Sequence, residues 1–196
     1  MAHHAYVVNS FEELGEQACS IFKSRLEGMI KEKKLSRSEK PRLCMQLNGN
    51  EEKSTDRIRQ EMEISNNVIV LMTTNFMLNP RILEEVTIAR HLDKRIICVQ
   101  WKEGNKGYDF SQLLDYQTKY AQQEGVTEEL VQALQKRGYG LEEVQTTLQR
   151  VFSNVYRQFS IDGSPRIMEA EMVDLVQIMA WPEPPKTEKR RACCIM

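Results

Sequence analysis

The sequence predicts an α/β fold in which a parallel β-sheet carries helices on both faces. Segments rich in β-forming residues alternate with amphipathic helical segments over the first 100 residues, and this alternation is typical of parallel sheets. The segment Val68–Met72 is apolar throughout, as expected of a central strand that is covered on both sides. With 196 residues, 41% of them hydrophobic and 28% charged, the chain suits one globular domain with an appendage.

A long helix is predicted between the first two strands. Ala5–Val8 is a short run of β-formers, and Leu43–Leu47 is a second one, which Asn48–Asn50 ends. Between them, apolar residues at four-residue steps give one apolar face to a helix over Phe11–Lys33. These residues are Leu14, Ala18, Phe22, Leu26 and Ile30.

Two further helices and strands follow up to residue 100. Ser54, Thr55 and Asp56 cap a helix that runs to about Ile64. After the strand Val68–Met72, Pro80 opens a helix to about His91, and Arg95–Gln100 forms the next strand. The side chains expected inside the fold are Ile58, Met62, Ile64, Ile82, Leu83, Val86 and Ala89.

The pattern changes after Trp101, where no clear strand is visible. Three helices are predicted instead, over Thr127–Lys136, Leu141–Phe159 and Arg166–Met179. The sequence leaves open whether the last helix packs on the domain or docks on a partner or a bilayer. We therefore divide the chain into an α/β domain over residues 1–160, a C-terminal helix over 161–180 and a flexible basic tail over 181–196.

Composition excludes several classes of protein. The net charge of -1 gives no general signal for nucleic acid, no apolar run reaches membrane-spanning length, and the first residues lack the pattern of a secretory signal. The isolated Cys19, Cys44 and Cys98 are typical of reduced core cysteines in a cytosolic protein. No residue spacing indicates a metal site.

The last four residues, Cys193-Cys194-Ile195-Met196, match the signal for prenylation. Such a signal has a cysteine four residues from the end and an aliphatic residue two places later, and a terminal Met favours farnesyl. Cys193 is the cysteine with this spacing. We therefore expect a lipid on Cys193 and a location at the cytoplasmic face of a membrane.

A proline-containing spacer and a group of basic residues precede this signal. A single lipid chain binds membranes only marginally, so a second signal is usual. Cationic side chains near an anionic leaflet can supply it, at about 1 kcal/mol each. The four candidates are Lys186, Lys189, Arg190 and Arg191.

Five segments between residues 51 and 100 have a characteristic order and spacing: Lys53–Gln60, Ile64–Leu71, Thr73–Phe76, Leu83–Ala89 and Ile96–Val99. With the elements around them, they resemble a Toll/interleukin-1 receptor (TIR) domain over roughly residues 5–158, and the similarity is best over 51–100. It is greatest to the NAD-cleaving TIR domains. This resemblance implies a flavodoxin-like parallel sheet with helices on both faces, followed by C-terminal helices and the tail.

The resemblance also implies two functions. TIR domains associate with one another as signalling scaffolds, so the expected partners are other TIR-like domains or further copies of this chain. Some also cleave NAD+ through an oxocarbenium-like state that a carboxylate stabilises. By position, Glu85 matches the catalytic glutamate, and Ser10, Phe11 and Lys53 fall where loops line the NAD+ pocket. NAD+ is then a substrate, with no tightly bound cofactor.

Other interpretations compete with these. Arg81-Ile82 replaces the aromatic or Trp-Cys pair that usually precedes the glutamate, and Glu85 could instead be a surface glutamate that pairs with Arg81 or Lys94. A nucleoside deoxyribosyltransferase-like hydrolase shares the strand order and remains an alternative enzyme. A small GTPase is excluded, because Val8–Glu12 supplies no phosphate-binding glycines or lysine. The leading prediction is a membrane-anchored TIR-like signalling module, with an NAD+ glycohydrolase using Glu85 as the alternative.

Overall fold

Five parallel strands form the central sheet, in the order β2-β1-β3-β4-β6. The structure is a computed structural model that describes residues 4–32, 43–45, 53–104, 106–110, 113–123, 125–152 and 157–179. A short β5 pairs antiparallel with the end of β4. The strands are β1 Ala5–Val8, β2 Leu43–Met45, β3 Asn67–Met72, β4 Arg95–Glu103, β5 Lys106–Gly107 and β6 Arg157–Ser160.

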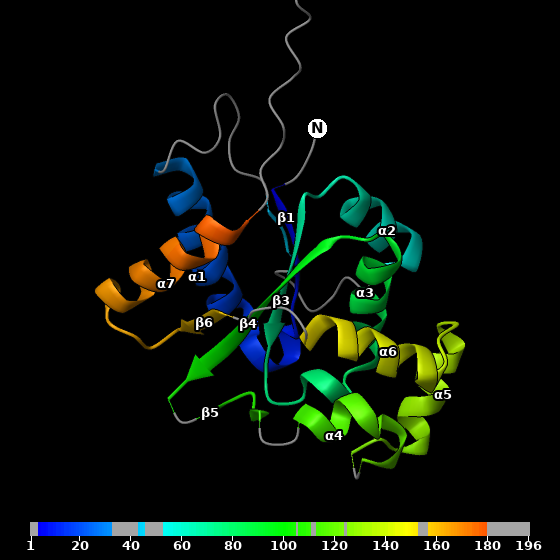
Figure 1. The fold of residues 1–196 in the computed structure, drawn as a ribbon. Coiled ribbons are helices and arrows are strands. Elements are labelled where there is room, and N and C mark those ends of the chain that lie inside the picture. The colour runs from blue at the N-terminus through cyan, green and yellow to red at the C-terminus, as the bar shows by residue number, and fades with distance from the viewer. Residues whose placement is uncertain are drawn as a thin grey trace, which may run out of the picture.

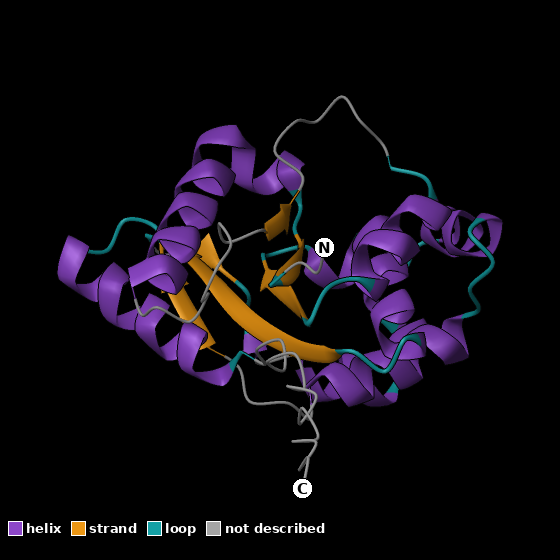
Figure 2. Ribbon diagram, turned by 90° about the horizontal axis from the view of Figure 1, so that it is seen from above, coloured by secondary structure: helices purple, strands orange, loops and turns teal. Residues whose placement is uncertain are grey.

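Helices cover both faces of this sheet (Figures 1 and 2). On one face lie α1 and α7, and on the other α2, α3 and α6, with α4 and α5 beyond them (Figure 1). The helices are α1 Phe11–Glu32, α2 Thr55–Glu63, α3 Pro80–His91, α4 Leu113–Thr118, α5 Glu128–Lys136, α6 Leu141–Phe152 and α7 Pro165–Ile178. Short 3-10 turns occupy Phe76–Leu78 and Tyr120–Gln122.

The strand β3 shows how one apolar run serves two cores. Side chains of a strand point alternately to its two faces. Val68, Val70 and Met72 belong to the core under α2 and α3, whereas Ile69 and Leu71 belong to the core under α1 and α7. All five are completely buried, at 0% exposure, which is why this segment has no polar alternation.

The predicted α/β fold is confirmed, and most of its elements lie where the sequence placed them. The predicted helix Pro80–His91 coincides with α3, because the Asn79 side chain accepts hydrogen bonds from the backbone N–H groups of Arg81 and Ile82 and Pro80 takes the first helical position. The Ser54 side chain caps α2 in the same way, accepting from Arg57 N–H. Residues 46–47 of the second predicted strand lie outside the described part of the chain.

Three predictions from the sequence are wrong in detail. The helix predicted over Leu141–Phe159 ends at Phe152, and β6 uses Arg157–Ser160 as a fifth parallel strand. This strand has only four residues and buries one of them, Phe159, so it gives almost no alternating pattern. The helix α4 was not predicted. Ile64 is 46% exposed because it lies beyond the last turn of α2, where the helical face no longer directs it inward.

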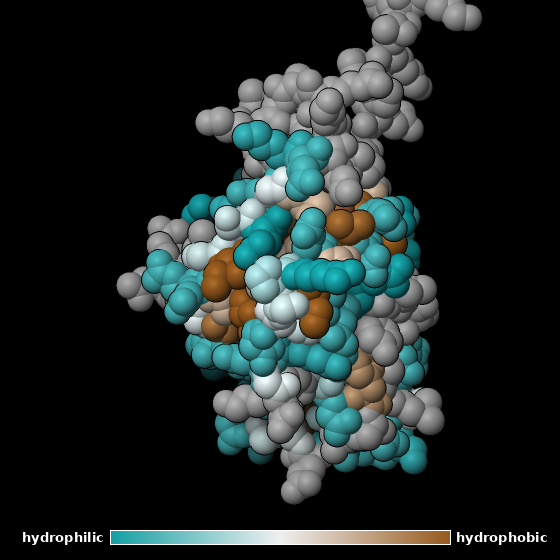
Figure 3. Space-filling model, turned by 90° about the vertical axis from the view of Figure 1, so that its left-hand side faces the viewer, coloured by the Kyte–Doolittle hydropathy of each residue, from teal (hydrophilic) through white to brown (hydrophobic). Residues whose placement is uncertain are grey.

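The last helix, α7, packs on the domain. Met168, Met172, Leu175 and Val176 are buried in the core that α1, β4 and β6 share. Ile167, at 50% exposure, lies on the outer side. Figure 3 shows this side of the molecule as largely hydrophilic, with small hydrophobic areas separated by polar residues. The apolar stripe of α7 is therefore used inside the fold, except for Ile167.

The tail lies outside the described residues, and with it Cys193, Lys186, Lys189, Arg190 and Arg191. Within the described part of the chain, no helix combines the length and the apolar character that crossing a membrane requires.

Candidate functional site

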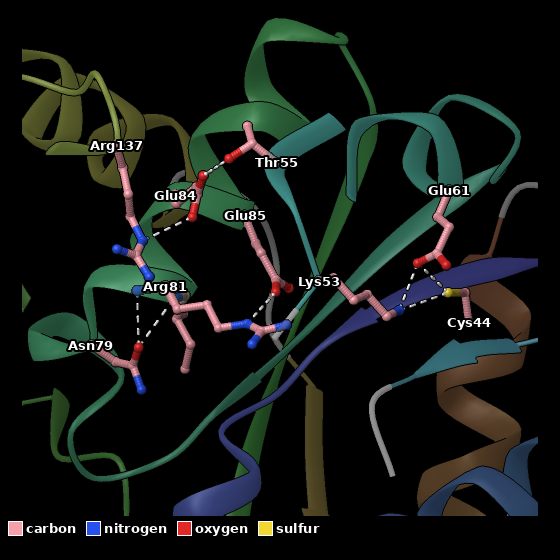
Figure 4. Close-up of polar contacts among 10 residues, drawn as sticks. Cys44, Lys53, Thr55, Glu61, Asn79, Arg81, Glu84, Glu85 and Arg137 are labelled. Carbon is pink, nitrogen blue, oxygen red and sulfur yellow. Dashed lines mark hydrogen bonds and ion pairs between the residues drawn. The ribbon is translucent and has the colours of Figure 1, made fainter. Parts of the chain in front are cut away.

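Six side chains from five segments form a largely buried cluster of charged and polar groups beneath α2 and α3, which we call the buried charged cluster. Figure 4 labels all of them except Tyr6. The cluster joins strands β1 and β2, the residue before the N-cap of α2, and the helices α2 and α3 themselves. It holds two cations and two carboxylates, so its formal charges balance. Its members are Tyr6, Cys44, Lys53, Glu61, Arg81 and Glu85.

Glu85 lies in the second turn of α3 and is only 5% exposed. Its Oε1 accepts a hydrogen bond from Arg81 Nε at 3.1 Å, one helical turn earlier, and its carboxyl also accepts a hydrogen bond from Tyr6. Of the two pairings considered from the sequence, the structure has the one with Arg81. Glu85 is buried rather than on the surface, and Lys94 instead donates to the backbone carbonyls of Glu63 and Ser65.

Burial raises the pKa of the Glu85 carboxyl above its usual value, and this effect outweighs the lowering influence of Arg81, Lys53 and the Tyr6 hydrogen bond. Burial, followed by the nearby Glu85, also raises the pKa of Tyr6. The Tyr6 hydroxyl therefore stays protonated and can serve as a donor to Glu85. Glu85 is a carboxyl group that takes up a proton more readily than an exposed glutamate.

Lys53 connects the other half of the cluster. Its side chain is 9% exposed, and Nζ lies 2.6 Å from Glu61 Oε2 and 3.3 Å from Cys44 Sγ. The same ammonium lies 5.2 Å from the centroid of the Tyr6 ring, a favourable cation–π distance. Tyr6 thus touches both halves of the cluster, through its ring on one side and its hydroxyl on the other.

Cys44 and Glu61 have pKa values displaced in opposite directions. The Cys44 thiol donates to Glu61 Oε2 at 2.9 Å, and burial, reinforced by that hydrogen bond, raises the pKa of Cys44 to about 11. Burial alone would raise the pKa of Glu61, but hydrogen bonds from Cys44, Lys53 and Arg57 together lower it. Cys44 is therefore a protonated thiol rather than a reactive thiolate.

Glu84, the neighbour of Glu85, makes a separate set of contacts. It is 4% exposed, accepts from Thr55 Oγ1 at 2.6 Å and pairs with Arg137 Nε at 3.0 Å. These bonds connect α3 to the start of α2 and the end of α5. Successive helical residues point about 100° apart, so the sequence indicates that Glu84 and Glu85 have different neighbours. It could not identify Thr55 and Arg137 as the neighbours of Glu84.

The structure brings together only part of the pocket that the resemblance implies. Lys53 and Glu85 belong to one cluster. Phe11, by contrast, packs against the core on the α1 and α7 side of the sheet, away from Glu85. Ser10 is buried at the end of β1, at 4% exposure. Among the described residues, no three His, Cys, Asp or Glu side chains come together in a way that could hold a metal ion.

Comparison with known proteins supports the fold. No protein-family model matches the chain, and no curated protein is similar to it in sequence. Among solved structures, the chain is similar to the TIR domains in the structure of the activated Roq1 resistosome that directly recognises the pathogen effector XopQ. The TM-score is 0.50 at 11% sequence identity, and the match covers 90% of this chain and 98% of the other.

Proposed function

The chain has a TIR-like fold, and from this premise we propose that it is a signalling module that is anchored at the cytoplasmic face of a membrane. It acts by contact with further copies of itself or with other TIR-like domains. The similar TIR domains belong to an activated resistosome, which supports a role in assembly. The anchor is a prenyl group on Cys193, assisted by Lys186, Lys189, Arg190 and Arg191.

The observation that favours contact over catalysis is the buried pair between Arg81 and Glu85. A carboxylate that stabilises an oxocarbenium-like state must face the positive charge that develops on the substrate. Glu85 instead faces the guanidinium of Arg81 at 3.1 Å and a hydrogen bond from Tyr6. The nearest partners of the Glu85 carboxyl therefore lie within the domain, which suits a role in holding α3 against β1.

The anchor explains how a weakly self-associating domain can act. Confining copies to a surface raises their effective concentration, so contacts that are negligible in solution become populated. One prenyl chain alone holds a protein marginally, and the four cations near the leaflet contribute about 1 kcal/mol each. Recruitment and assembly then depend on the same short tail.

Membrane fractionation of the wild type and Cys193→Ser in cells tests the anchor, with Cys194→Ser as the matched control. We expect Cys193→Ser to move to the soluble fraction and Cys194→Ser to stay with membranes. Cross-linking of the prenylated chain on vesicles should give oligomers that Cys193→Ser does not form. Equal partitioning of both variants contradicts the anchor, and equal cross-linking contradicts surface-driven assembly.

A second candidate function is cleavage of NAD+ with Glu85 as the catalytic carboxylate. It is favoured by the buried position of Glu85 and by the proximity of Lys53 in the same cluster. Nicotinamide release from NAD+ by the purified chain, in solution and at high density on vesicles, separates the two candidates. The contact function predicts no release in either condition.

If nicotinamide is released, Glu85→Gln should abolish the activity and Glu84→Gln should not. Both variants remove one buried carboxylate from α3, so Glu84→Gln controls for the structural effect. Activity in Glu85→Gln would exclude this site assignment. Release of base from simple nucleosides but not from NAD+ would instead indicate the nucleoside hydrolase.

A further inference from the structure

A second polar site, separate from the buried charged cluster, is a cavity of about 330 Å³ at the start of β4. None of its lining residues belongs to the cluster. Four of the seven are basic, and the other three are isoleucines that form its apolar part. The residues are Lys94, Arg95, Arg150, Arg157, Ile96, Ile97 and Ile178.

The register of the sheet creates the space for this cavity. β6 begins at Arg157, which lies opposite Val99 of β4. The first four residues of β4, Arg95 to Cys98, are therefore not paired with β6. Arg150 comes from the last turns of α6, and Ile178 is the last residue of α7. These two helices flank β4 from opposite faces of the sheet (Figure 1). The basic side chains therefore come from β4, α6, β6 and the turn before β4, and they meet at the amino edge of the sheet.

The charged residues that line this cavity are all basic, and carboxylates lie beside two of them, Asp93 beside Arg150 and Glu63 near Lys94. Arg150 pairs with Asp93, which is highly exposed, with 82% of its side chain accessible, and Lys94 donates to two backbone carbonyls, of Glu63 and Ser65. Burial lowers the pKa of Lys94, as expected where a cation is partly removed from water, and a bound anion would oppose that shift. Guanidinium groups bind phosphate oxygens in a bidentate manner. A multiply charged phosphate is therefore the anion that fits.

The position of the cavity indicates the source of the phosphate. Ile178 is followed by Met179, and Cys193 lies 14 residues beyond Met179. Fully extended, those residues span at most roughly 50 Å, so a lipid on Cys193 leaves this edge of the domain within reach of the bilayer. We propose that the cavity binds the phosphorylated headgroup of an anionic membrane lipid. The choice of a lipid over a free phosphate rests on the membrane anchor proposed above.

The test uses the full chain in a Cys193→Ser background, so that its result does not depend on prenylation. Sedimentation measures binding to three kinds of vesicle: phosphatidylcholine alone, phosphatidylcholine with phosphatidylserine, and phosphatidylcholine with phosphatidylinositol bisphosphate. The two anionic kinds are matched in surface charge. We expect tighter binding to the phosphoinositide vesicles than to the phosphatidylserine vesicles. Equal binding to both overturns the proposal, because the basic tail alone would then account for it.

Two variants and a control locate the binding. Arg95→Gln should weaken phosphoinositide binding roughly fivefold, the effect of about 1 kcal/mol for one cation near an anionic surface. Asp93→Asn should strengthen it, because it frees the charge of Arg150, and asparagine tolerates the left-handed backbone of residue 93 (φ 49°). Arg25→Gln, on the exposed side of α1, removes the same charge elsewhere and should have no specific effect.

Several results would overturn the assignment. One such result is equal binding of Arg95→Gln and Arg25→Gln to the phosphoinositide vesicles. Another is an Asp93→Asn variant that unfolds at the same temperature as the wild type but binds these vesicles no more tightly. Soluble inositol trisphosphate is the probe for a free phosphate. If it binds and the phosphoinositide vesicles do not sediment the protein, the lipid source is wrong.

Discussion

Replacing Arg81 by Met tests whether the pair with Glu85 is a structural contact. The substitution removes the guanidinium and keeps an unbranched side chain in α3. Glu85, at 5% exposure, then retains only the hydrogen bond from Tyr6 and the more distant charge of Lys53. The carboxylate must either stay charged without its closest partner or take up a proton.

Loss of one member of a buried ion pair costs about 3–5 kcal/mol. The Arg81 side chain is 19% exposed and two partners of Glu85 remain, so we expect a smaller loss, about 2–3 kcal/mol near neutral pH. For a domain of this size each kcal/mol corresponds to about 2–4 °C in Tm. The expected decrease in Tm is therefore roughly 4–12 °C.

This loss should depend on pH in a defined direction. Burial raises the pKa of Glu85 in the folded state, and removing Arg81 takes away a group that lowers it. A carboxyl with a raised folded pKa stabilises the fold most at low pH, and that contribution is lost as pH rises through the folded pKa. The deficit of Arg81→Met relative to wild type should therefore be smaller at about pH 5 than at about pH 7.5.

Urea unfolding measures these quantities for the wild type, Arg81→Met, Glu85→Gln and the double variant. At neutral pH the double variant should recover much of the stability that Arg81→Met loses, because no buried charge remains. Glu16→Gln, on the exposed side of α1, controls for the change in net charge that Glu85→Gln makes. An equal loss at both pH values, with no recovery in the double variant, would refute the argument that Arg81 compensates a buried Glu85 charge.

Three further perturbations have expected outcomes. Arg137→Ala should reduce the free energy of unfolding by about 1–3 kcal/mol, because it removes the charged partner of Glu84, which is 4% exposed. In a double-mutant cycle, the further change Glu84→Gln should restore part of this loss. Phe22→Ala should cost about 3–5 kcal/mol in urea unfolding, and near-UV circular dichroism should show the changed environment of Trp101, whose ring centroid lies 6.2 Å from that of Phe22. Glu61 has a lowered pKa in the folded state, so its contribution to stability is present above its unfolded pKa and is lost as pH falls through its folded pKa. The stability of Glu61→Gln should therefore approach that of the wild type in acid. A difference in stability that stays constant with pH would contradict this prediction.

The sequence was most informative where one local interaction determines an element. Val68–Met72 is apolar because β3 is covered on both faces, and the start of α3 follows from Asn79 and Pro80. By contrast, β6 has one buried residue, Phe159, and depends on pairing with β4, so its neighbours in sequence carry little information about it.

The buried charged cluster could be predicted only in part, for a related reason. The resemblance to TIR domains pointed to Lys53 and Glu85, and the sequence raised a pairing of Glu85 with Arg81 at the i,i+4 spacing. The contacts of Lys53 with Cys44 and Glu61, and of Tyr6 with Glu85, join segments that only the packed sheet brings together. No local pattern could have identified them.

The burial of α7 also has a geometric consequence for a lipid-anchored chain. The tail continues from a helix that is fixed in the core beside α1 and ends next to the start of β4. The tail alone reaches up to roughly 50 Å and leaves the domain free to turn. The headgroup binding proposed above would add a second attachment at the start of β4, and the carboxyl edge of the sheet would then be directed away from the lipid. Two such copies would have mainly in-plane rotation and sliding left to search before their matching surfaces meet.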